Sequence, residues 1–181
     1  RGGRDRFADA RIGVDRLPQR PLTGVAKSLP VALHGSLAGS ASAEVKFDGK
    51  AGQKVVIEVE AQRLGSKLRP VLHLIGPRGL QMTWAWPSSV RSGDARLEAT
   101  LVDDGTHTAV VHDTEYAAAA PGFFRLKIGQ WSFVDQVFPP AIGRGVKSPL
   151  ELLGSETQRS EAASSPIGDV LPLTWPKDGV W

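Results

Sequence analysis

The 181-residue sequence contains no cysteine and no asparagine. Without cysteine there can be no disulfide, no thiolate metal ligand and no cysteine nucleophile, so packing has to stabilise the fold. Without asparagine there is no acceptor for N-glycosylation. A third absence is any apolar run of the roughly 18 to 20 residues that a membrane-spanning helix needs. We therefore expect no transmembrane segment, whereas the lack of cysteine does not decide between the cytosol and the exterior.

The sequence also lacks a leader at its start. It begins with Arg1 rather than methionine, and no basic start is followed by an apolar stretch. We therefore expect that any signal peptide lies upstream or has been removed, and that this chain is a mature or excised piece.

Concentrated positive charge is missing as well. The 22 basic residues are scattered among 19 acidic ones, which gives a net charge of only +3. Six arginines enrich the first twenty residues, but Asp5, Asp9 and Asp15 alternate with them. Because sequence-independent nucleic-acid binding needs a concentrated basic face, nucleic acid is not an expected partner. The composition is that of a globular protein, with 41% hydrophobic residues to build an interior.

Short strands separated by turns dominate the centre of the chain. In residues 43–47, Ala43, Val45 and Phe47 share one face, and in residues 54–61 the alternation is clearer still. The candidate strands are 31–37, 43–47, 54–61, 71–75, 80–86, 95–102, 106–112 and 123–128. Eight or nine strands at this spacing predict an all-β fold, a two-sheet antiparallel β-sandwich with jelly-roll-like topology.

The predicted domain organisation has three parts. Residues 1–28 form an N-terminal arm or the end of a preceding module, and residues 29–138 form the sandwich. Residues 139–181 form a linker followed by the start of another β module or a docking tail. The last ten residues carry Trp175 and Trp181, which we expect to serve in assembly or docking.

Several motifs follow one another between residues 29 and 138. They are Leu29-Pro30-Val31, Phe47-Asp48-Gly49-Lys50-Ala51-Gly52-Gln53, Arg63-Leu64-Gly65-Ser66, Asp94-Ala95-Arg96-Leu97, Asp103-Asp104-Gly105-Thr106, His112-Asp113 with Tyr116, and Phe124-Arg125-Leu126-Lys127-Ile128-Gly129. In this order they resemble the bacterial pre-peptidase C-terminal (PPC) domain, of the kind found in large exported planctomycete-type multidomain proteins. Gly52 and Asp104-Gly105 fit this pattern, since we expect them to supply the positive φ values of tight returns, the second in a short hairpin.

The resemblance implies an exported, periplasmic or cell-surface accessory domain that contacts polysaccharide or protein surfaces. Many members of the family bind calcium through acidic loops. The corresponding positions here read Gln19-Arg20-Pro21-Leu22 and Ser40-Ala41-Ser42, which lack the anionic oxygens that calcium prefers. No cofactor or metal is therefore expected.

Signals for catalysis are absent. The sequence has no Gly-x-Ser-x-Gly elbow, no phosphate-binding loop and no His-Glu-x-x-His. His107 and His112 are an odd number of residues apart on one expected strand, so their side chains should point to opposite faces and cannot share an ion. We predict that the chain is not an enzyme.

Tryptophans are the sharper candidates, because sandwiches that bind polysaccharide stack sugar rings on exposed aromatics. Leu80, Met82, Trp84 and Trp86 share one face of their strand, which favours the core for Trp84 and an exposed strand end for Trp86. Trp131 lies in an expected turn and is a second surface candidate. Trp86 and Trp131 are thus the predicted binding residues.

Charged residues of the strands are expected on solvent faces. This prediction covers Lys46, Glu58, Glu60, Arg96 and Glu98, whose cross-strand pairing would add little stability.

Three functions follow from these observations. The first is a non-catalytic binding or assembly module of an exported multidomain protein, contacting polysaccharide or protein. The second is a structural subunit or spacer, held in a larger assembly by its terminal arms. The third is an accessory domain of a secreted hydrolase or protease.

Overall fold

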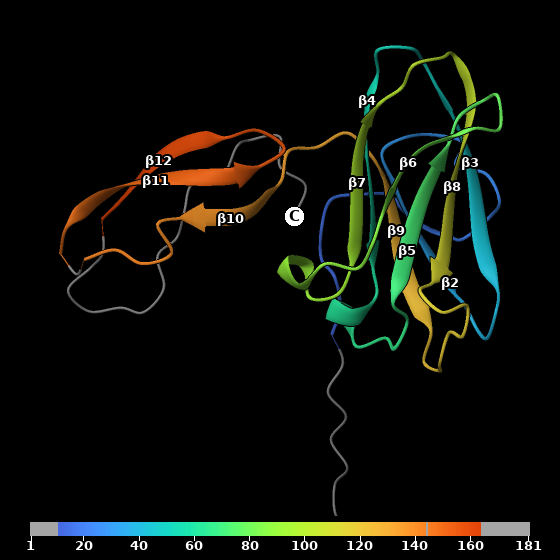
Figure 1. The fold of residues 1–181 in the computed structure, drawn as a ribbon, viewed down its shortest axis with the longest axis horizontal. Coiled ribbons are helices and arrows are strands. Elements are labelled where there is room, and N and C mark those ends of the chain that lie inside the picture. The colour runs from blue at the N-terminus through green and yellow to red at the C-terminus, as the bar shows by residue number, and fades with distance from the viewer. Residues whose placement is uncertain (1–10, 144, 164–181) are drawn as a thin grey trace, which may run out of the picture.

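The computed structural model describes residues 11–143 and 145–163, which consist mainly of β-strands (Figure 1). The strands are β1 (Gln19–Pro21), β2 (Val31–Ser36), β3 (Ser42–Gly49), β4 (Lys54–Glu60), β5 (Pro70–Ile75), β6 (Gln81–Ala85), β7 (Ala95–Thr100), β8 (Gly105–Asp113), β9 (Phe123–Gly129), β10 (Val134–Phe138), β11 (Lys147–Gly154) and β12 (Gln158–Ala163). Two single 3₁₀ turns, η1 (Gln62–Leu64) and η2 (Ser89–Arg91), interrupt them. Within the described ranges, no helix is long and apolar enough to cross a membrane.

Two sheets form the sandwich. One has the order β1-β2-β9-β4-β7 and the other β3-β8-β5-β6. The pairs β2/β9, β3/β8, β4/β7 and β5/β6 are all antiparallel and nested, like one long hairpin folded over on itself. This nesting is the jelly-roll arrangement, so the predicted all-β, two-sheet antiparallel sandwich is confirmed. β1 pairs with β2 in parallel and adds a short edge strand from the predicted N-terminal arm.

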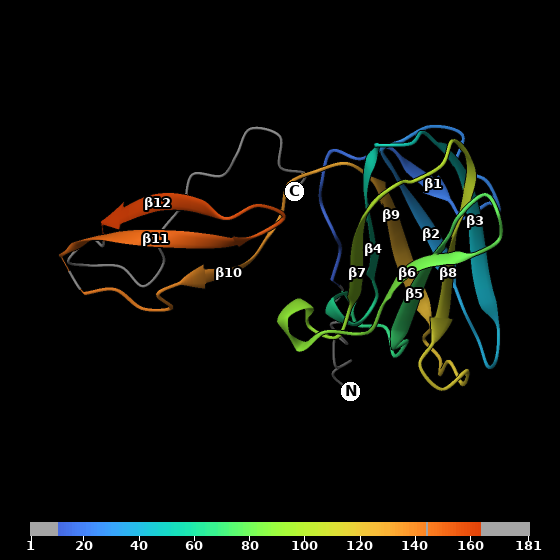
Figure 2. The ribbon, with the colours of Figure 1, turned by 45° about the horizontal axis from the view of Figure 1, so that its top comes forward.

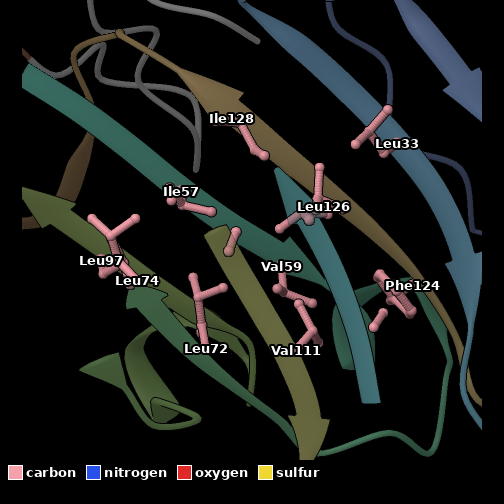
Figure 3. Close-up of a cluster of buried hydrophobic side chains, with 14 of the residues drawn as sticks. Leu33, Ile57, Val59, Leu72, Leu74, Leu97, Val111, Phe124, Leu126 and Ile128 are labelled. Carbon is pink, nitrogen blue, oxygen red and sulfur yellow. The ribbon is translucent and has the colours of Figure 1, made fainter. Parts of the chain in front are cut away.

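The core lies between the two sheets and follows the alternation of the strands. Val55, Ile57 and Val59 of β4 point inward, as predicted, and none of the three is exposed to solvent. Figure 3 shows Ile57 and Val59 among inward side chains of both sheets, which include Leu72, Val111 and Leu126. The aliphatic interior accounts for the stability of a chain that has no cysteine.

The crossings between sheets differ from one expectation. Asp104-Gly105 does not close a short hairpin, because β7 and β8 belong to different sheets. Gly105 does have a positive φ of 131°, and the carboxylate of Asp104 accepts the Ala51 N–H at 2.7 Å, which ties this crossing to the β3–β4 crossing. The predicted positive φ at Gly105 is therefore confirmed, whereas the predicted short hairpin is wrong.

A third sheet, β10-β11-β12, lies to one side of the sandwich (Figures 1 and 2). β10 is antiparallel to β11, and β11 to β12. β10 falls within the predicted sandwich range 29–138 but pairs outside the sandwich. After residue 139 the described chain continues with β11 and β12, which form this sheet together with β10.

Candidate functional site

Six polar and aromatic side chains gather on the outer face of the four-stranded sheet. They come from β5, β6, β8 and the segments that follow β6 and β8. We call this surface the aromatic face and define it by His73, Gln81, Trp84, Trp86, His112 and Tyr116. Together with Val71 and Thr114 they line a shallow depression of about 370 Å³. A depression of about 410 Å³ beside β6 and β7 has no aromatic ring in its lining, so the aromatic face is the better candidate for a binding site.

A β-bulge in β6 brings Trp84 to this face. Thr83 lies opposite Leu74 and Gln81 opposite Ile75, so Met82 is an extra residue without a partner. Met82 packs partly against the core, and Trp84, opposite His73, points outward with 50% of its surface exposed. The prediction that Trp84 lies in the core is therefore wrong, because the bulge shifts the inward and outward alternation by one residue.

Trp86 follows the end of β6 and is 51% exposed, which agrees with its predicted place at an exposed strand end. Its ring makes an edge contact with Trp84, with centroids 5.9 Å apart and an interplanar angle of 78°. Tyr116, 55% exposed, brings a third ring to the same depression. Three half-exposed aromatic rings in one depression are unusual for a surface with no partner, because their apolar area would remain in water.

His73 and His112 form the floor between the rings. Their Nε2 atoms are 2.9 Å apart, and the two imidazoles lie at an interplanar angle of 20°. Tyr116 stacks flat on His112, with centroids 4.2 Å apart and an angle of 6°. His112 is buried by these neighbours, whereas His73 is half-buried. His112 therefore contacts two rings, His73 at its edge and Tyr116 on its flat face.

Asp113 fixes the turn that presents Tyr116. Its two carboxylate oxygens accept the N–H groups of Arg69 and Glu115 at 3.0 Å each, and its backbone carbonyl accepts the Tyr116 N–H at 3.0 Å. Burial by itself would raise the pKa of Asp113, but these backbone N–H groups outweigh burial and lower it. The ionised Asp113 holds Tyr116 in a left-handed conformation with φ of 53°.

The histidine pattern is partly as predicted. His107 and His112 do point to opposite faces: His107 is fully buried against Phe47, with ring centroids 5.7 Å apart. The sequence did not reveal that His112 meets His73, since the two residues lie on neighbouring strands and only the β5/β8 register makes them diagonal neighbours. In the part of the chain that the structure describes, no group of three or more His, Asp or Glu side chains could hold a metal ion.

Trp131 does not lie on the surface. It is only 6% exposed, and Nζ of Lys127 lies 5.6 Å from its ring centroid. Gly129 leaves the room for this ring, because a Cβ there would come within 3.0 Å of Trp131 and 2.6 Å of Pro30. The expectation that Trp131 is exposed in its turn is therefore wrong. Trp175 and Trp181, the predicted docking residues, lie outside the described residues.

A buried network of ion pairs covers the outer face of the other sheet. Glu58 is 1% exposed and Glu60 6%, so the prediction that they decorate a solvent face is wrong. Lys127 bridges the two carboxylates, at 2.7 Å from Glu58 and 2.8 Å from Glu60. Arg96, also predicted on a solvent face, is largely buried and pairs with Glu58 at 3.0 Å, and Arg63 pairs with Glu58 as well. Lys46 and Glu98 are exposed as expected.

Glu58 is the centre of this network. Burial alone would raise the pKa of its carboxyl, but the charges of Lys127, Arg96 and Arg63 together outweigh burial and lower it to about 2. The network also includes Arg125, which pairs with Glu60, and it reaches both flanks of the sandwich. Arg125 pairs with Asp15 at 2.5 Å, and Arg96 pairs with Asp135 at 2.6 Å. The part of this face around Glu58 is therefore filled by the chain's own charges.

Comparison with known proteins finds similarity only at the level of structure. No family model matches the chain, and no curated protein is similar enough in sequence to count as a relative. A solved pre-peptidase C-terminal domain of a collagenase from Bacillus anthracis superposes with a TM-score of 0.46 at 12% identity, covering 62% of this chain and 97% of that one.

Two periplasmic inhibitors of g-type lysozyme, both PliG, are also similar. The Aeromonas hydrophila protein has a TM-score of 0.44 at 18% identity and covers 64% of this chain and 98% of its own. The Salmonella Typhimurium protein has a TM-score of 0.41 at 17% identity, with coverages of 61% and 97%. Because these TM-scores lie below 0.5, they establish neither family nor function for this chain, and the PPC assignment stays a prediction.

Proposed function

We propose that this chain is a non-catalytic binding module that takes polysaccharide on the aromatic face. The observation that carries the proposal is the presence of Trp84, Trp86 and Tyr116, each at least half exposed, in one depression. Sugar rings offer C–H groups to aromatic faces and hydroxyls to nearby polar groups, and Gln81 and Thr114 supply such groups beside the rings. In this proposal Trp84, rather than the buried Trp131, is the second binding tryptophan beside Trp86.

A binding role fits this site better than catalysis. The lining of the depression contains no carboxylate and no serine. Each imidazole has both nitrogens engaged, by the other histidine and by an oxygen acceptor, so neither is free to act as a general base. The described residues around the aromatic face therefore lack the paired groups that hydrolysis needs.

The test is a binding assay against a panel of insoluble and soluble polysaccharides. We expect Trp84→Ala and Trp86→Ala each to weaken binding by about tenfold, since each removes one stacking ring. Phe138→Ala is the matched control, because Phe138 is a 60% exposed aromatic residue on β10, away from the aromatic face. The proposal is overturned if the wild type binds no polymer, or if both tryptophan variants bind as tightly as the wild type.

A second candidate is a structural subunit or spacer. It is favoured by the ion pairs that fasten both flanks to the sandwich, Asp15 to Arg125 and Asp135 to Arg96. In this role the flanks hold the sandwich in a fixed position relative to neighbouring modules, and the aromatic face contacts protein. A defined multimer in solution, together with flanks that resist protease, would support it. A monomer whose flanks are cleaved rapidly would count against it.

Export of the module, with neighbouring domains or subunits as partners, belongs to the same proposal. Export follows from the resemblance to PPC domains and from the use of polysaccharide as a ligand. Detection of the protein in the periplasmic, cell-surface or extracellular fraction of its host would test it, and a purely cytosolic location would contradict it.

A further inference from the structure

The hydrogen bonds of His73 and His112 determine how many protons the two rings carry. Nδ1 of His73 lies 2.7 Å from Oε1 of Gln81, and Nδ1 of His112 lies 2.7 Å from the backbone oxygen of Asp113. Both oxygens can only accept, so each Nδ1 has to donate and carries a hydrogen. In a neutral imidazole the remaining nitrogen, Nε2, is then an acceptor.

Those two acceptors face each other. The Nε2 atoms are 2.9 Å apart, which is a hydrogen-bond distance, and the nearly parallel rings have centroids 5.1 Å apart. That separation equals the nitrogen distance plus about one ring width, so the rings meet head-on and edge to edge. Two lone pairs at this distance repel unless a cation lies between them. We infer that His73 and His112 share one additional proton as an imidazole–imidazolium pair, and that the ligand of the aromatic face is therefore an acidic polysaccharide.

A proton fits this gap and a metal ion does not. A metal ion midway would lie about 1.5 Å from each nitrogen, half of the 2.9 Å, whereas zinc needs about 2.0 to 2.1 Å. Tyr116 stabilises the proton in two ways. Its ring lies flat on His112, which presents the negative face of a π system to the cation, and its hydroxyl lies 3.3 Å from Nε2 of His112.

The charges around the pair leave this positive charge uncompensated. The lining contributes no Asp, Glu, Lys or Arg. On β3 the nearest outward carboxylate is Glu44, which is exposed and separated from His73 by Val110 of β8. At the rim, Arg69 and Glu115 neutralise each other at 2.9 Å, and the Asp113 carboxylate accepts backbone N–H groups. From β6 only Gln81 and the tryptophans face the pair. A carboxylate on the ligand would complete the site.

The choice of an acidic polymer rests on the proposed function, whereas the shared proton does not. The proton is tested without any ligand, by nitrogen-15 NMR of the labelled chain. At about pH 5.5 we expect three N–H protons on the two rings and a coupling between the two Nε2 nuclei through the hydrogen bond. Two neutral rings at pH 5.5 would overturn the proposal, as occurs if the Gln81 amide is reversed and donates to His73.

The ligand class is tested with polygalacturonate and its fully methyl-esterified form, which share one sugar backbone and carry either carboxylates or their uncharged methyl esters. At about pH 5.5 we expect the wild type to bind the acidic polymer roughly tenfold more tightly than the ester. His73→Gln should abolish this preference, because the variant cannot share the additional proton with His112. His34→Gln, a variant of an exposed histidine on the other sheet, should leave the preference intact.

The outcomes separate the two proposals. Equal binding of the two polymers would overturn the assignment of an acidic ligand. Binding of neither polymer, nor of any other in the panel, would refute the proposed function and with it the ligand class, while the NMR result would still decide the shared proton.

Discussion

Nζ of Lys127 lies 2.7 Å from the carboxylate of Glu58, and both side chains are buried on a sheet face that points away from the sandwich core. Two buried charges are costly to remove from water, so the pair persists only because further charges satisfy them. Arg63 and Arg96 supply the further positive charges for Glu58, and Glu60 supplies the further negative charge for Lys127. The result is an ionic layer over an otherwise ordinary β-sheet.

Replacing Glu58 by Gln should destabilise the fold in a pH-dependent way. The pKa of Glu58 is lowered to about 2 from an ordinary value of 4.5. A lowered carboxyl pKa gives stability that is complete above about pH 4.5 and declines as the pH falls towards 2. We expect Glu58→Gln to cost about 3 kcal/mol at pH 7 and little near pH 2, measured by urea denaturation.

The matched control is Glu98→Gln, because Glu98 lies opposite Val56 of β4 but is exposed. Its free energy of unfolding should change by less than about 0.5 kcal/mol at either pH. A Glu58→Gln variant whose deficit is the same at pH 7 and at pH 2 would contradict the role given to the ionised carboxylate.

Replacing Asp15 by Ala should release the N-terminal flank. Asp15 pairs with the buried Arg125 at 2.5 Å and also accepts the Leu17 N–H at 3.0 Å. Its removal leaves Arg125 with Glu60 as its remaining carboxylate. We expect faster tryptic cleavage after Arg16 and a free energy of unfolding that is lower by about 1 to 3 kcal/mol. The control is Asp48→Ala, which removes one exposed hydrogen bond from Thr106 and should leave cleavage after Arg16 unchanged. Equal cleavage rates in the wild type and both variants would contradict the role of Asp15 in holding the N-terminal flank.

Truncating Trp131 and truncating Trp86 should have opposite consequences. Trp131 is buried, so Trp131→Ala should lower the free energy of unfolding by about 3 to 5 kcal/mol. Trp86 is half exposed, so Trp86→Ala should change it by less than about 1 kcal/mol. Thermal and urea denaturation of the two variants will compare them. A stable Trp131→Ala variant would show that the ring is not packed as described.

Strand positions could be predicted because inward alternation is a local property. The strand around Ile57 was recognised from its own neighbours, and the Phe47–Gln53 turn from its glycines. What lies outside each strand could not be predicted in this way. Glu58 was assigned to solvent because its burial depends on Arg63, Arg96 and Lys127, and two of these come from strands that are remote in sequence.

The aromatic face escaped prediction for two further reasons. One extra residue at Met82 reverses the face on which Trp84 appears, and nothing in the alternation of residues 80–86 marks that bulge. His73 and His112 are 39 residues apart, so their contact depends on strand register rather than on any motif. Trp86 was placed correctly because exposure at a strand end needs no knowledge of register.

The nested pairing of the strands also decides how the module responds to force. Val31, at the start of β2, lies opposite Ile128, near the end of β9, so the chain enters and leaves the sandwich at the same end of two adjacent antiparallel strands. A longer polypeptide under tension would pull these two strands apart from that end, one hydrogen bond after another, rather than shearing them all at once. In the chain, Asp15 precedes β2 and Asp135 follows β9, and their ion pairs with Arg125 and Arg96 join the two flanks to the sandwich. These ion pairs would bear the tension first and would have to break before the two strands separate.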